Sequence, residues 1–394
     1  HDNFGEDLII NVRNGGIYYW DKSTSSAPFA PAVALSDLAG ADPTTPTIAK
    51  QVMISDRDRH VIVFGCDAQD NIGVQDPLLI RFSDQENPLV WSAQATNTAG
   101  DLRIGTGSEI ITAVETRQQI LVFTDKSLHA MQYLGPPFTF GISMLSENIT
   151  IASPLAAIAV DDMVMWMGEQ EFYIYSGQVQ KLPCSVRSYV FNDFNQDQAE
   201  KVTAAVNSSY SEIWWFYPSA TVTNGLMNQN IDKYVVYNYQ EKVWYYGNLA
   251  RSAWIDRGIG QYPIAASLDG YLYYHEFGND DGSVNPPAGI TSYIESSQMS
   301  IGAGDNFVLL SKLIPDVTFD GSSSPSPNVD FTFQTRRFPG SAYDQTTVSD
   351  IIRSSTVPVE QFTDQVRLRM RGRSFALKIQ SDNTGVEWRL GTPR

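Results

Sequence analysis

The sequence predicts an all-β fold: a β-propeller with an additional β-rich C-terminal region. Aromatic residues make up 12% of the chain, and its strongest apolar runs are rich in Tyr, Phe, Val and Thr, which favour pleated strands. Short aromatic or β-branched runs closed by turn residues recur throughout, whereas helical spacing of apolar residues is scarce. The 394 residues also exceed the usual size of one compact core, so two domains or one large closed β-structure are expected.

The expected strands of the first part follow one another as single strands and hairpins. They are residues 16–20, 60–65, 119–123 with 127–133, 171–175 with 178–182, 212–217, 234–237 with 242–246, and 270–274. Asp269-Gly270 is the clearest two-residue hairpin turn among them.

Seven of these strands recur, on average, about every 42 residues, close to the roughly 40–50 residues of a four-stranded propeller blade. Their central residues are Tyr18, Val63, Val122, Tyr173, Trp214, Val236 and Tyr273. The individual spacings vary from about 22 to 59 residues, so a stack of sandwiches remains an alternative. Closing blades into a ring would remove exposed sheet edges.

A stretch dense in turn formers, residues 278–289, predicts a boundary near residue 290. We expect a propeller over 1–290 and a β-rich domain over 291–394 that packs on it or closes it. The sequence begins without Met and close to a strand, so we expect the first blade to be completed by upstream residues or by the C-terminal part. Strands of the second part are expected at 293–301, 307–319, 329–335, 366–380 and 386–390.

The formal net charge of −17 argues against a protein that grips nucleic acid along its whole surface. The charge is uneven: residues 329–394 hold ten basic and seven acidic residues, whereas the residues before them hold 17 basic and 37 acidic ones. Any contact with DNA is therefore expected to be local or repulsive.

The two cysteines, Cys66 and Cys184, form neither a redox pair nor a disulfide framework, which fits assembly in a reducing cytoplasm. No apolar run approaches the roughly 18–20 residues needed to cross a bilayer, so membrane insertion is not expected.

Residues suited to catalysis or cofactor binding are sparse. The chain has four histidines, and no hydrolase, zinc-protease or phosphate-loop motif surrounds a nucleophile, so we expect neither an enzyme nor a cofactor. Asp56, Asp58 and His60 alternate, as one face of a strand that binds a metal would require. A charged hairpin containing Arg57 and Arg59 is the favoured interpretation, so no metal site is expected.

Four arginines alternate in one expected strand: Arg367, Arg369, Arg371 and Arg373. Alternation would place all four side chains on one face. This basic stripe is our candidate subunit interface or DNA-facing site. An acidic surface on a neighbouring copy is favoured over DNA, because no aromatic residues are interleaved to stack bases. A solvated outer face is the third interpretation.

Several stretches, in order, resemble the tail proteins of short-tailed bacteriophages known as tail nozzle, packaged-DNA stabilisation or tail tubular proteins. The stretches are NFGEDL (3–8), GIYYWD (16–21), PLLIRFSDQENP (77–88) with Trp91, AGDLR (99–103), RMRGRSFALKI (369–379) and GVEWRLG (385–391).

The resemblance implies a structural virion protein of the tail, assembled in the host bacterial cytoplasm. It implies a homohexameric ring below the portal and the tail adaptor, or head-to-tail connector, with a channel that retains double-stranded DNA and passes it during ejection. Tail fibres or tailspikes and a tail needle or tip protein are the further partners that it implies. The alternatives are a propeller that binds or cleaves host surface glycans, and a host-attachment module.

Overall fold

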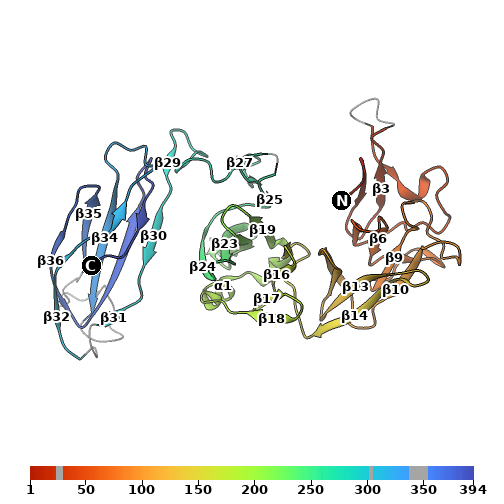
Figure 1. Ribbon diagram of the computed structural model, residues 1–394, viewed down its shortest axis with the longest axis horizontal. Helices are drawn as coiled ribbons and strands as arrows, with labels where there is room; N and C mark the ends of the chain where they lie inside the picture. The colour runs from red at the N-terminus through yellow and green to blue at the C-terminus, as the bar shows by residue number, and fades with distance from the viewer. Residues whose placement is uncertain (24–29, 259, 301–304, 337–353) are drawn as a thin grey trace. The chain divides into compact units, whose positions relative to one another are not determined.

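The computed structural model describes residues 1–23, 30–258, 260–300, 305–336 and 354–394 (Figure 1). The chain divides into two compact units, His1–His275 and Glu276–Arg394. Both consist mainly of antiparallel strands, and the helices of the described residues are one short α-helix, α1 (Arg187–Asp193), and two 3-10 turns. The all-β prediction is therefore confirmed. Among the described residues, no helix combines the length and the apolar character needed to cross a membrane.

The described part of the first unit contains six sheets of three or four strands, which follow one another along the chain and which we call blades 1 to 6. In order, they are β1–β4 (Asp2–Phe4, Asp7–Asn11, Ile17–Trp20, Val33–Ala34); β5, β6, β9 and β10 (Gln51–Ile54, Val61–Phe64, Leu79–Phe82, Gly100–Arg103); β11–β14 (Ile110–Glu115, Ile120–Thr124, Ser127–Gly135, Thr139–Glu147); β15–β18 (Ala157–Val160, Met163–Met167, Phe172–Tyr175, Val179–Leu182); β19, β20, β23 and β24 (Thr203–Asn207, Glu212–Pro218, Ile231–Asn238, Val243–Asn248); and β25–β27 (Ala253–Ile255, Ile264–Ala266, Leu272–Tyr274).

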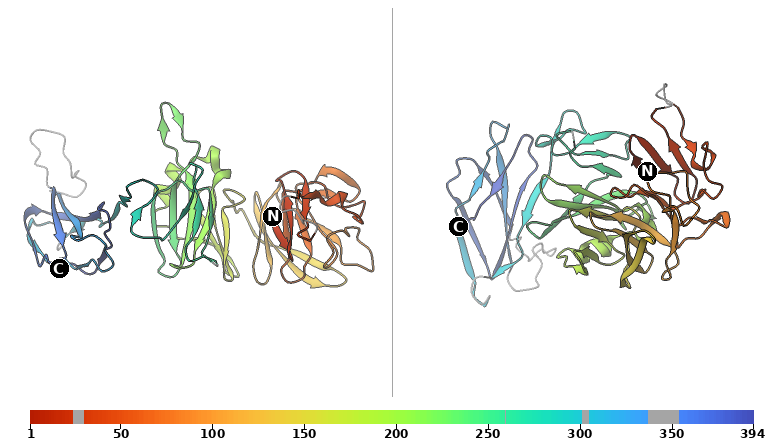
Figure 2. Two further views of the ribbon diagram at one scale, coloured as in Figure 1. Left: turned by 90° about the horizontal axis from the view of Figure 1, so that it is seen from above. Right: turned by 45° about the vertical axis from the view of Figure 1, so that its right-hand side comes forward.

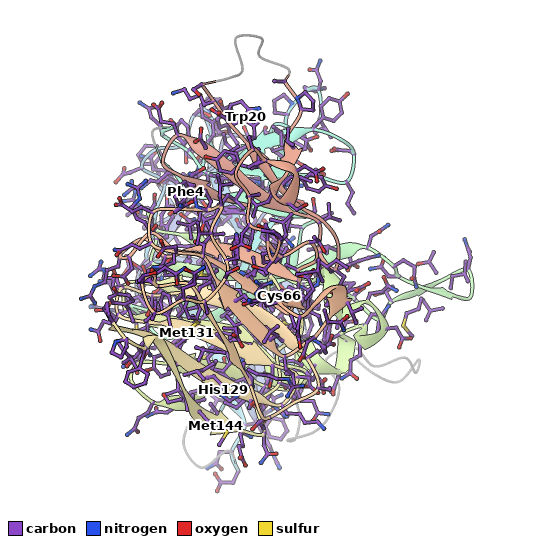
Figure 3. The ribbon with its side chains drawn as sticks, turned by 90° about the vertical axis from the view of Figure 1, so that its right-hand side faces the viewer. Phe4, Trp20, Cys66, His129, Met131 and Met144 are labelled. Carbon is purple, nitrogen blue, oxygen red and sulfur yellow. The ribbon has the colours of Figure 1, made fainter. Side chains whose placement is uncertain are left out.

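The second strand of blades 2 to 5 is buried almost throughout, because its two faces pack on two different blades. In β12 of blade 3, Ile120 and Val122 join an apolar cluster with blade 2, whereas Leu121 and Phe123 join one with blade 4. Met131 of the adjacent β13 is fully buried in the cluster with blade 2 (Figure 3). This packing explains why these strands are continuous apolar runs instead of alternating ones.

Large aromatic side chains fill the space between blades 4 and 5. The rings of Phe172 and Trp215 lie 5.0 Å apart, and both residues are fully buried. The indole N–H of Trp215 donates to the carbonyl of Ala156 at 3.0 Å, so this buried polar group is satisfied.

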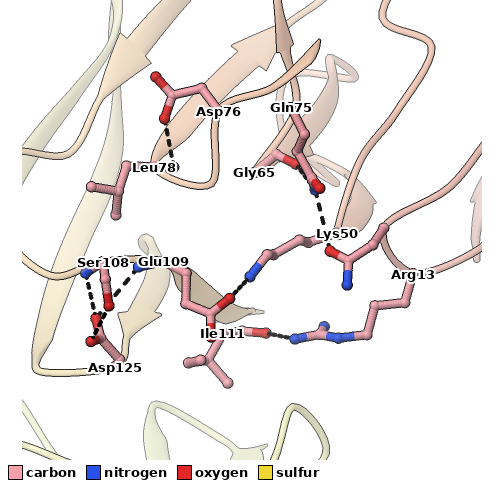
Figure 4. Close-up of polar contacts among 11 residues, drawn as sticks. Arg13, Lys50, Gly65, Gln75, Asp76, Leu78, Ser108, Glu109, Ile111 and Asp125 are labelled. Atoms are coloured by element: carbon pink, nitrogen blue, oxygen red, sulfur yellow. Dashed lines mark hydrogen bonds and ion pairs between the residues drawn. The ribbon is translucent and has the colours of Figure 1, made fainter. Parts of the chain in front are cut away.

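Polar side chains join the first three blades at their loops (Figure 4). The Arg13 guanidinium donates to the carbonyl of Ile111 at 3.0 Å, which links blade 1 to blade 3. Lys50, almost fully buried, forms an ion pair with Glu109. Because an unpaired buried ammonium would be costly, this ion pair is required by the burial of Lys50.

A two-stranded hairpin stands out from blade 5 between β20 and β23. It comprises β21 (Val222–Thr223) and β22 (Leu226–Met227), joined through Asn224 and Gly225, which both have positive φ. Figure 2 (left) shows this green hairpin projecting from its sheet. Another small hairpin, β7 (Asp67–Ala68) with β8 (Asn71–Gln75), forms a separate sheet inserted in the chain between β6 and β9 of blade 2.

The second unit is a set of sheets around its own apolar core. Strands β30 (Ser292–Glu295), β31 (Met299–Ser300), β34 (Asn328–Arg336), β35 (Ser354–Glu360) and β37 (Ser374–Ser381) form one sheet. Further pairs are β32 (Val308–Leu313) with β36 (Val366–Gly372), β33 (Val317–Thr318) with β38 (Arg389–Leu390), and β28 (Asp280–Asp281) with β29 (Ala288–Gly289). The core includes Phe331, Phe333, Leu368, Met370 and Ile379 from the first sheet and from β36.

The following details, among others, differ from the sequence prediction. The marker residues Trp214 and Val236 lie in one blade, so the seven marked strands belong to six sheets. The turn at Asp269-Gly270 is a three-residue loop, because Ser267 and Tyr271 are the residues that close it. The single strand expected over 366–380 is two strands in different sheets, β36 and β37.

Truncation of the aromatic core should show how much the blades depend on it. We expect Trp215→Ala to lower the free energy of unfolding by about 3–5 kcal/mol, because it leaves a cavity between blades 4 and 5. Chemical denaturation followed by circular dichroism would measure this loss. The control Tyr271→Ala removes a ring that is 67% exposed and should change stability by no more than about 0.5 kcal/mol. Equal losses of unfolding free energy in the two variants would contradict a stabilising role of Trp215 between blades 4 and 5.

Candidate interaction site: a basic strand in the C-terminal unit

Strand β36 alternates between core and surface along its whole length. Val366, Leu368 and Met370 point into the core of the second unit, whereas Arg367, Arg369 and Arg371 are exposed. The alternation follows from the strand repeat of two residues. Three of the four predicted arginines therefore share one face.

The fourth predicted arginine, Arg373, lies beyond the end of β36 and is half-buried. It occupies the bend between β36 and β37, where its backbone N–H donates to the carbonyl of Arg336 at 2.9 Å. The adjacent Gly372 allows this close approach: a Cβ there would lie 2.8 Å from the Cβ of Thr335 and 3.0 Å from the Arg336 carbonyl oxygen. The chain crosses between sheets at this point, which is why the arginine alternation ends.

The pairing strand β32 adds another cation to the exposed face. Lys312 lies directly opposite Arg367 and is also exposed. Like charges in cross-strand positions repel each other. We call Lys312, Arg367, Arg369 and Arg371 the basic face.

An aromatic ring lies beside one end of the basic face. The guanidinium carbons of Arg371 and Arg373 are each 5.1 Å from the centroid of the Phe307 ring, within cation–π range. Sequence reasoning missed both Phe307 and Lys312, because only the long-range pairing of β32 with β36 brings them here. Because the guanidinium groups of Arg371 and Arg373 already lie over the Phe307 ring, this ring is a poor platform for stacking bases.

Three cations of the basic face lack compensating acids among the described residues. Lys312, Arg367 and Arg369 form no ion pair or hydrogen bond with any described residue. Guanidinium groups match carboxylates and phosphates through paired N–H donors. The arrangement is therefore suited to binding an anionic surface.

Carboxylates gather at the ends of β1, β5 and β11, the first strands of blades 1 to 3. Asp2 accepts a hydrogen bond from the Ile54 backbone N–H at 2.8 Å, and Glu115 accepts one from the Asp56 backbone N–H at 3.1 Å. Burial, and to a lesser degree the negative charges of Asp56, Asp2 and Asp58, raise the pKa of Glu115 to about 7 against the opposing effect of the hydrogen bond from the Asp56 backbone. These acids thus connect neighbouring blades while they repel one another.

Asp56, Asp58 and His60 do not form the metal-binding face considered from the sequence. Residues 56–58 form the turn between β5 and β6, and the described residues contain no group of acids, histidines and cysteines able to hold a metal ion. The His60 side chain is fully buried, with Phe140 at a centroid distance of 5.2 Å, and burial lowers its pKa. Its Nε2 lies 3.1 Å from the Thr98 hydroxyl. The favoured interpretation, a charged turn, is the one observed.

The stretch 77–88, which carries much of the family resemblance, has a structural role here. The fully buried guanidinium of Arg81 donates to the carbonyls of Thr44 at 2.6 Å and Asp67 at 3.2 Å. It also lies 5.8 Å from the ring of Trp91, whose indole donates to the Pro88 carbonyl. These contacts fix the loops of blade 2, so the buried part of the stretch is a fold feature, whereas Gln85 and Glu86 are exposed.

Comparisons with known proteins find no matching family model and no matching curated protein. Among solved structures, the extracellular domain of a one-component system from B. thetaiotaomicron matches with a TM-score of 0.41 and 9% identity over 67% of this chain. This chain spans 30% of that protein's chain.

Two further matches involve Nup159. A complex of dbp5 with nup159 and gle1 from S. cerevisiae gives a TM-score of 0.39 and 7% identity over 69% of this chain and 72% of the matched chain. The N-terminal domain of Nup159 gives a TM-score of 0.26 and 11% identity over 67% of this chain and 71% of the matched chain. These similarities carry no functional conclusion.

The raised pKa of Glu115 predicts a pH-dependent stability. A carboxyl whose folded pKa is about 7 binds a proton more readily in the folded than in the unfolded state, so its contribution to stability decreases as pH rises from about 4.5 towards 7. Glu115→Gln keeps the acceptor for Asp56 but cannot ionise. We expect the variant to be more stable than wild type at pH 8, with the difference disappearing near pH 4.5.

Thermal unfolding at both pH values would measure this difference. Glu241→Gln, at an exposed position, is the control and should leave the pH dependence unchanged. If the stability of Glu115→Gln varied with pH as that of wild type does, the carboxylates of Glu115, Asp2, Asp56 and Asp58 would be solvated independently of one another.

Proposed function

We propose that this chain is a structural subunit of a short-tailed bacteriophage tail, in which copies assemble into a ring below the portal and the adaptor. The observation that carries the proposal is the basic face: Arg367 and Arg369 lack acidic partners among the described residues of a chain with a net charge of −17. The basic face of one copy is attracted to the net negative charge of a neighbouring copy. The ordered stretches that resemble tail nozzle proteins support the same assignment.

The charge of the chain also suits a conduit for DNA. Duplex DNA is densely charged, and a basic lining would bind it by releasing counterions and thereby hold it. An acidic lining repels the phosphates and lets the duplex slide. On this proposal, the ring retains DNA mechanically and conducts it during ejection without capturing it along the wall.

The proposed partners follow from the family resemblance. They are further copies in a homohexamer, the tail adaptor, tail fibres or tailspikes, a needle or tip protein, and double-stranded DNA in passage. The proposed location is the virion tail, after assembly in the host cytoplasm. We propose no catalytic role and no cofactor.

Assembly of the purified protein tests the function directly. Light scattering after size-exclusion chromatography, with and without the adaptor, should give a closed oligomer that negative-stain images show as a ring. Antibody against this chain should label the tails of virions in electron micrographs. A protein that stays monomeric beside the adaptor, and that binds or cuts surface polysaccharide, would instead support the glycan-directed alternative.

Charge reversal on the basic face should weaken assembly. We expect Arg367→Glu with Arg369→Glu to raise the protein concentration needed for assembly at least tenfold, because two attractive contacts per copy become repulsive. The control, Arg389→Glu with Arg394→Glu, makes the same change of charge at exposed positions of the same unit and should assemble like wild type. Added salt should weaken wild-type assembly, since exposed charges are screened.

The same variants separate the two partners that arginines could bind. Loss of binding to a DNA duplex with normal assembly in Arg367→Glu, Arg369→Glu would assign the basic face to DNA. Normal assembly together with unchanged DNA binding would show that the basic face binds neither partner and is only solvated. The observation that carries the proposal would then no longer support it.

A further inference from the structure

The hairpin of β21 and β22 exposes apolar side chains on both of its faces. Val222 pairs with Met227 and Thr223 pairs with Leu226, so Val222 and Met227 share one face and Leu226 lies on the other. The side chains of Val222, Met227 and Leu226 are 60%, 40% and 75% exposed. An isolated two-stranded hairpin is only marginally stable in water, and most hairpins pack against another surface. Because this hairpin projects from blade 5, its apolar side chains are accessible to a partner (Figure 2).

Hydrogen bonds fix the base of the hairpin to blade 5 and to the segment that follows α1. The backbone N–H and the hydroxyl of Ser219 both donate to the carboxylate of Asp232, at 2.8 and 2.7 Å. On the other side of the hairpin, the side-chain amide of Asn195 donates to the carbonyl of Asn228 at 2.7 Å. These contacts set the direction in which the hairpin leaves the sheet. We call residues 219–230 the arm.

The tip of the arm is preformed and uncharged. Asn224 and Gly225 have φ angles of 53° and 77°, as the two-residue turn that matches the twist of paired strands requires. Residues 219–230 include no acidic or basic residue. A preformed element loses little conformational entropy when it binds, and an uncharged one loses no hydration of ions. The arm therefore has the properties of an element that can be buried in a protein interface.

An aromatic pair lies beside the base of the arm. The rings of Tyr189 in α1 and Tyr246 in β24 stack at a centroid distance of 3.9 Å, and both residues are partly exposed. The backbone N–H of Ala220 in the arm donates to the carbonyl of Asp193, the last residue of α1. The Asp193 carboxylate forms an ion pair with Lys233 at 2.6 Å, so the nearby charges are already paired. Large aromatic side chains and Met are enriched in protein interfaces, whereas unpaired Lys and Asp are depleted there.

We propose that the arm of each copy inserts into an apolar groove of a neighbouring copy, with the aromatic pair packed at the edge of this contact. The contact rests on the proposed function, since it presupposes the ring, and it adds an apolar contact to the one that the basic face provides. A groove is required because the arm has apolar side chains on both faces, and a flat surface would cover only one of them.

A second copy is the partner that the charge distribution favours. Each copy has a net charge of −17, so two copies repel each other except where their surfaces are neutral or opposite in charge. The arm is such a neutral surface. The same net charge disfavours an anionic lipid surface as the partner. A ring also needs unequal patches on every copy, and a projecting arm with a groove is an unequal pair of this kind.

Charge placed on the arm should weaken assembly. We expect Val222→Asp with Leu226→Asp to raise the protein concentration needed for assembly at least tenfold, because each new carboxylate would have to be buried in an apolar groove. Light scattering over a dilution series of the full chain would measure this change. Both positions are exposed in the single chain, so the circular dichroism spectrum of the variant should match that of wild type.

The matched control is Val12→Asp with Leu268→Asp, which makes the same changes of residue type and charge at exposed positions between β2 and β3 and between β26 and β27. The control should assemble like wild type. If wild type forms the ring and the arm variant assembles as well as the control, the arm contact is wrong while the proposed function stands. If wild type itself stays monomeric beside the adaptor, the proposed function fails, and the arm contact fails with it.

Photo-cross-linking identifies the partner of the arm. In the full chain, Leu226 would be replaced by the photoreactive residue p-benzoylphenylalanine, and Leu268 would be replaced in the same way as a control. Irradiation of the assembled protein should join two chains through residue 226, with the link mapped by mass spectrometry to an apolar surface outside the arm, and should give no such link from residue 268. Links only within one chain, from arm to arm, to the adaptor or to lipid in added vesicles would overturn the proposal, and so would the absence of any link.

Discussion

Burial of both faces of the second strand holds blades 2 to 5 of the first unit together. In β12 and β20, residues one position apart belong to cores on opposite sides of the sheet, so a single strand of five to seven residues contributes to two interfaces. A shift of register by one residue would exchange the two sets of side chains. The large rings of β20, Trp214 and Trp215, face opposite cores, so a shift by one residue would move each ring out of its own core.

This packing leaves no room for charge within the blades, and the exceptions show its cost. Lys50 and Arg81 are almost fully buried, and each is satisfied by named partners: Glu109 for the first, and the Thr44 and Asp67 carbonyls for the second. Many of the remaining charges lie at loops and strand ends, although Asp101 and Lys233 lie within β10 and β23. The acids at the ends of β1 and β11 are the clearest case, and their mutual repulsion raises the pKa of Glu115, in addition to the effect of burial. The fold therefore concentrates charge where blades meet solvent.

The sequence was sufficient for three hairpins of the first unit, β12–β13, β17–β18 and β23–β24, because aromatic and β-branched runs there are continuous and their turns are short, but it missed others such as β15–β16. It was insufficient where contacts with residues distant in the sequence determine the local structure. Strand β35 was missed because its Ser, Thr and Pro residues give a weak strand signal, and its pairing with the distant β34 supplies the order. The end of β36 was missed because only the folded chain brings Thr335 and Arg336 against Gly372. For the candidate site, local alternation predicted the exposure of Arg367, Arg369 and Arg371, whereas Lys312 and Phe307 depend on pairing over some sixty residues.

The separation of charge between the ends of the sequence makes the two parts of the proposed function depend on each other. A basic face left open in a channel would bind phosphates and slow the passage of DNA. If Arg367 and Arg369 are covered by carboxylates of a neighbouring copy, the same contacts that assemble the ring also remove its strongest DNA-binding surface. The remaining charge is then negative, and it repels the duplex. Assembly and conduction are in this way consequences of one charge distribution.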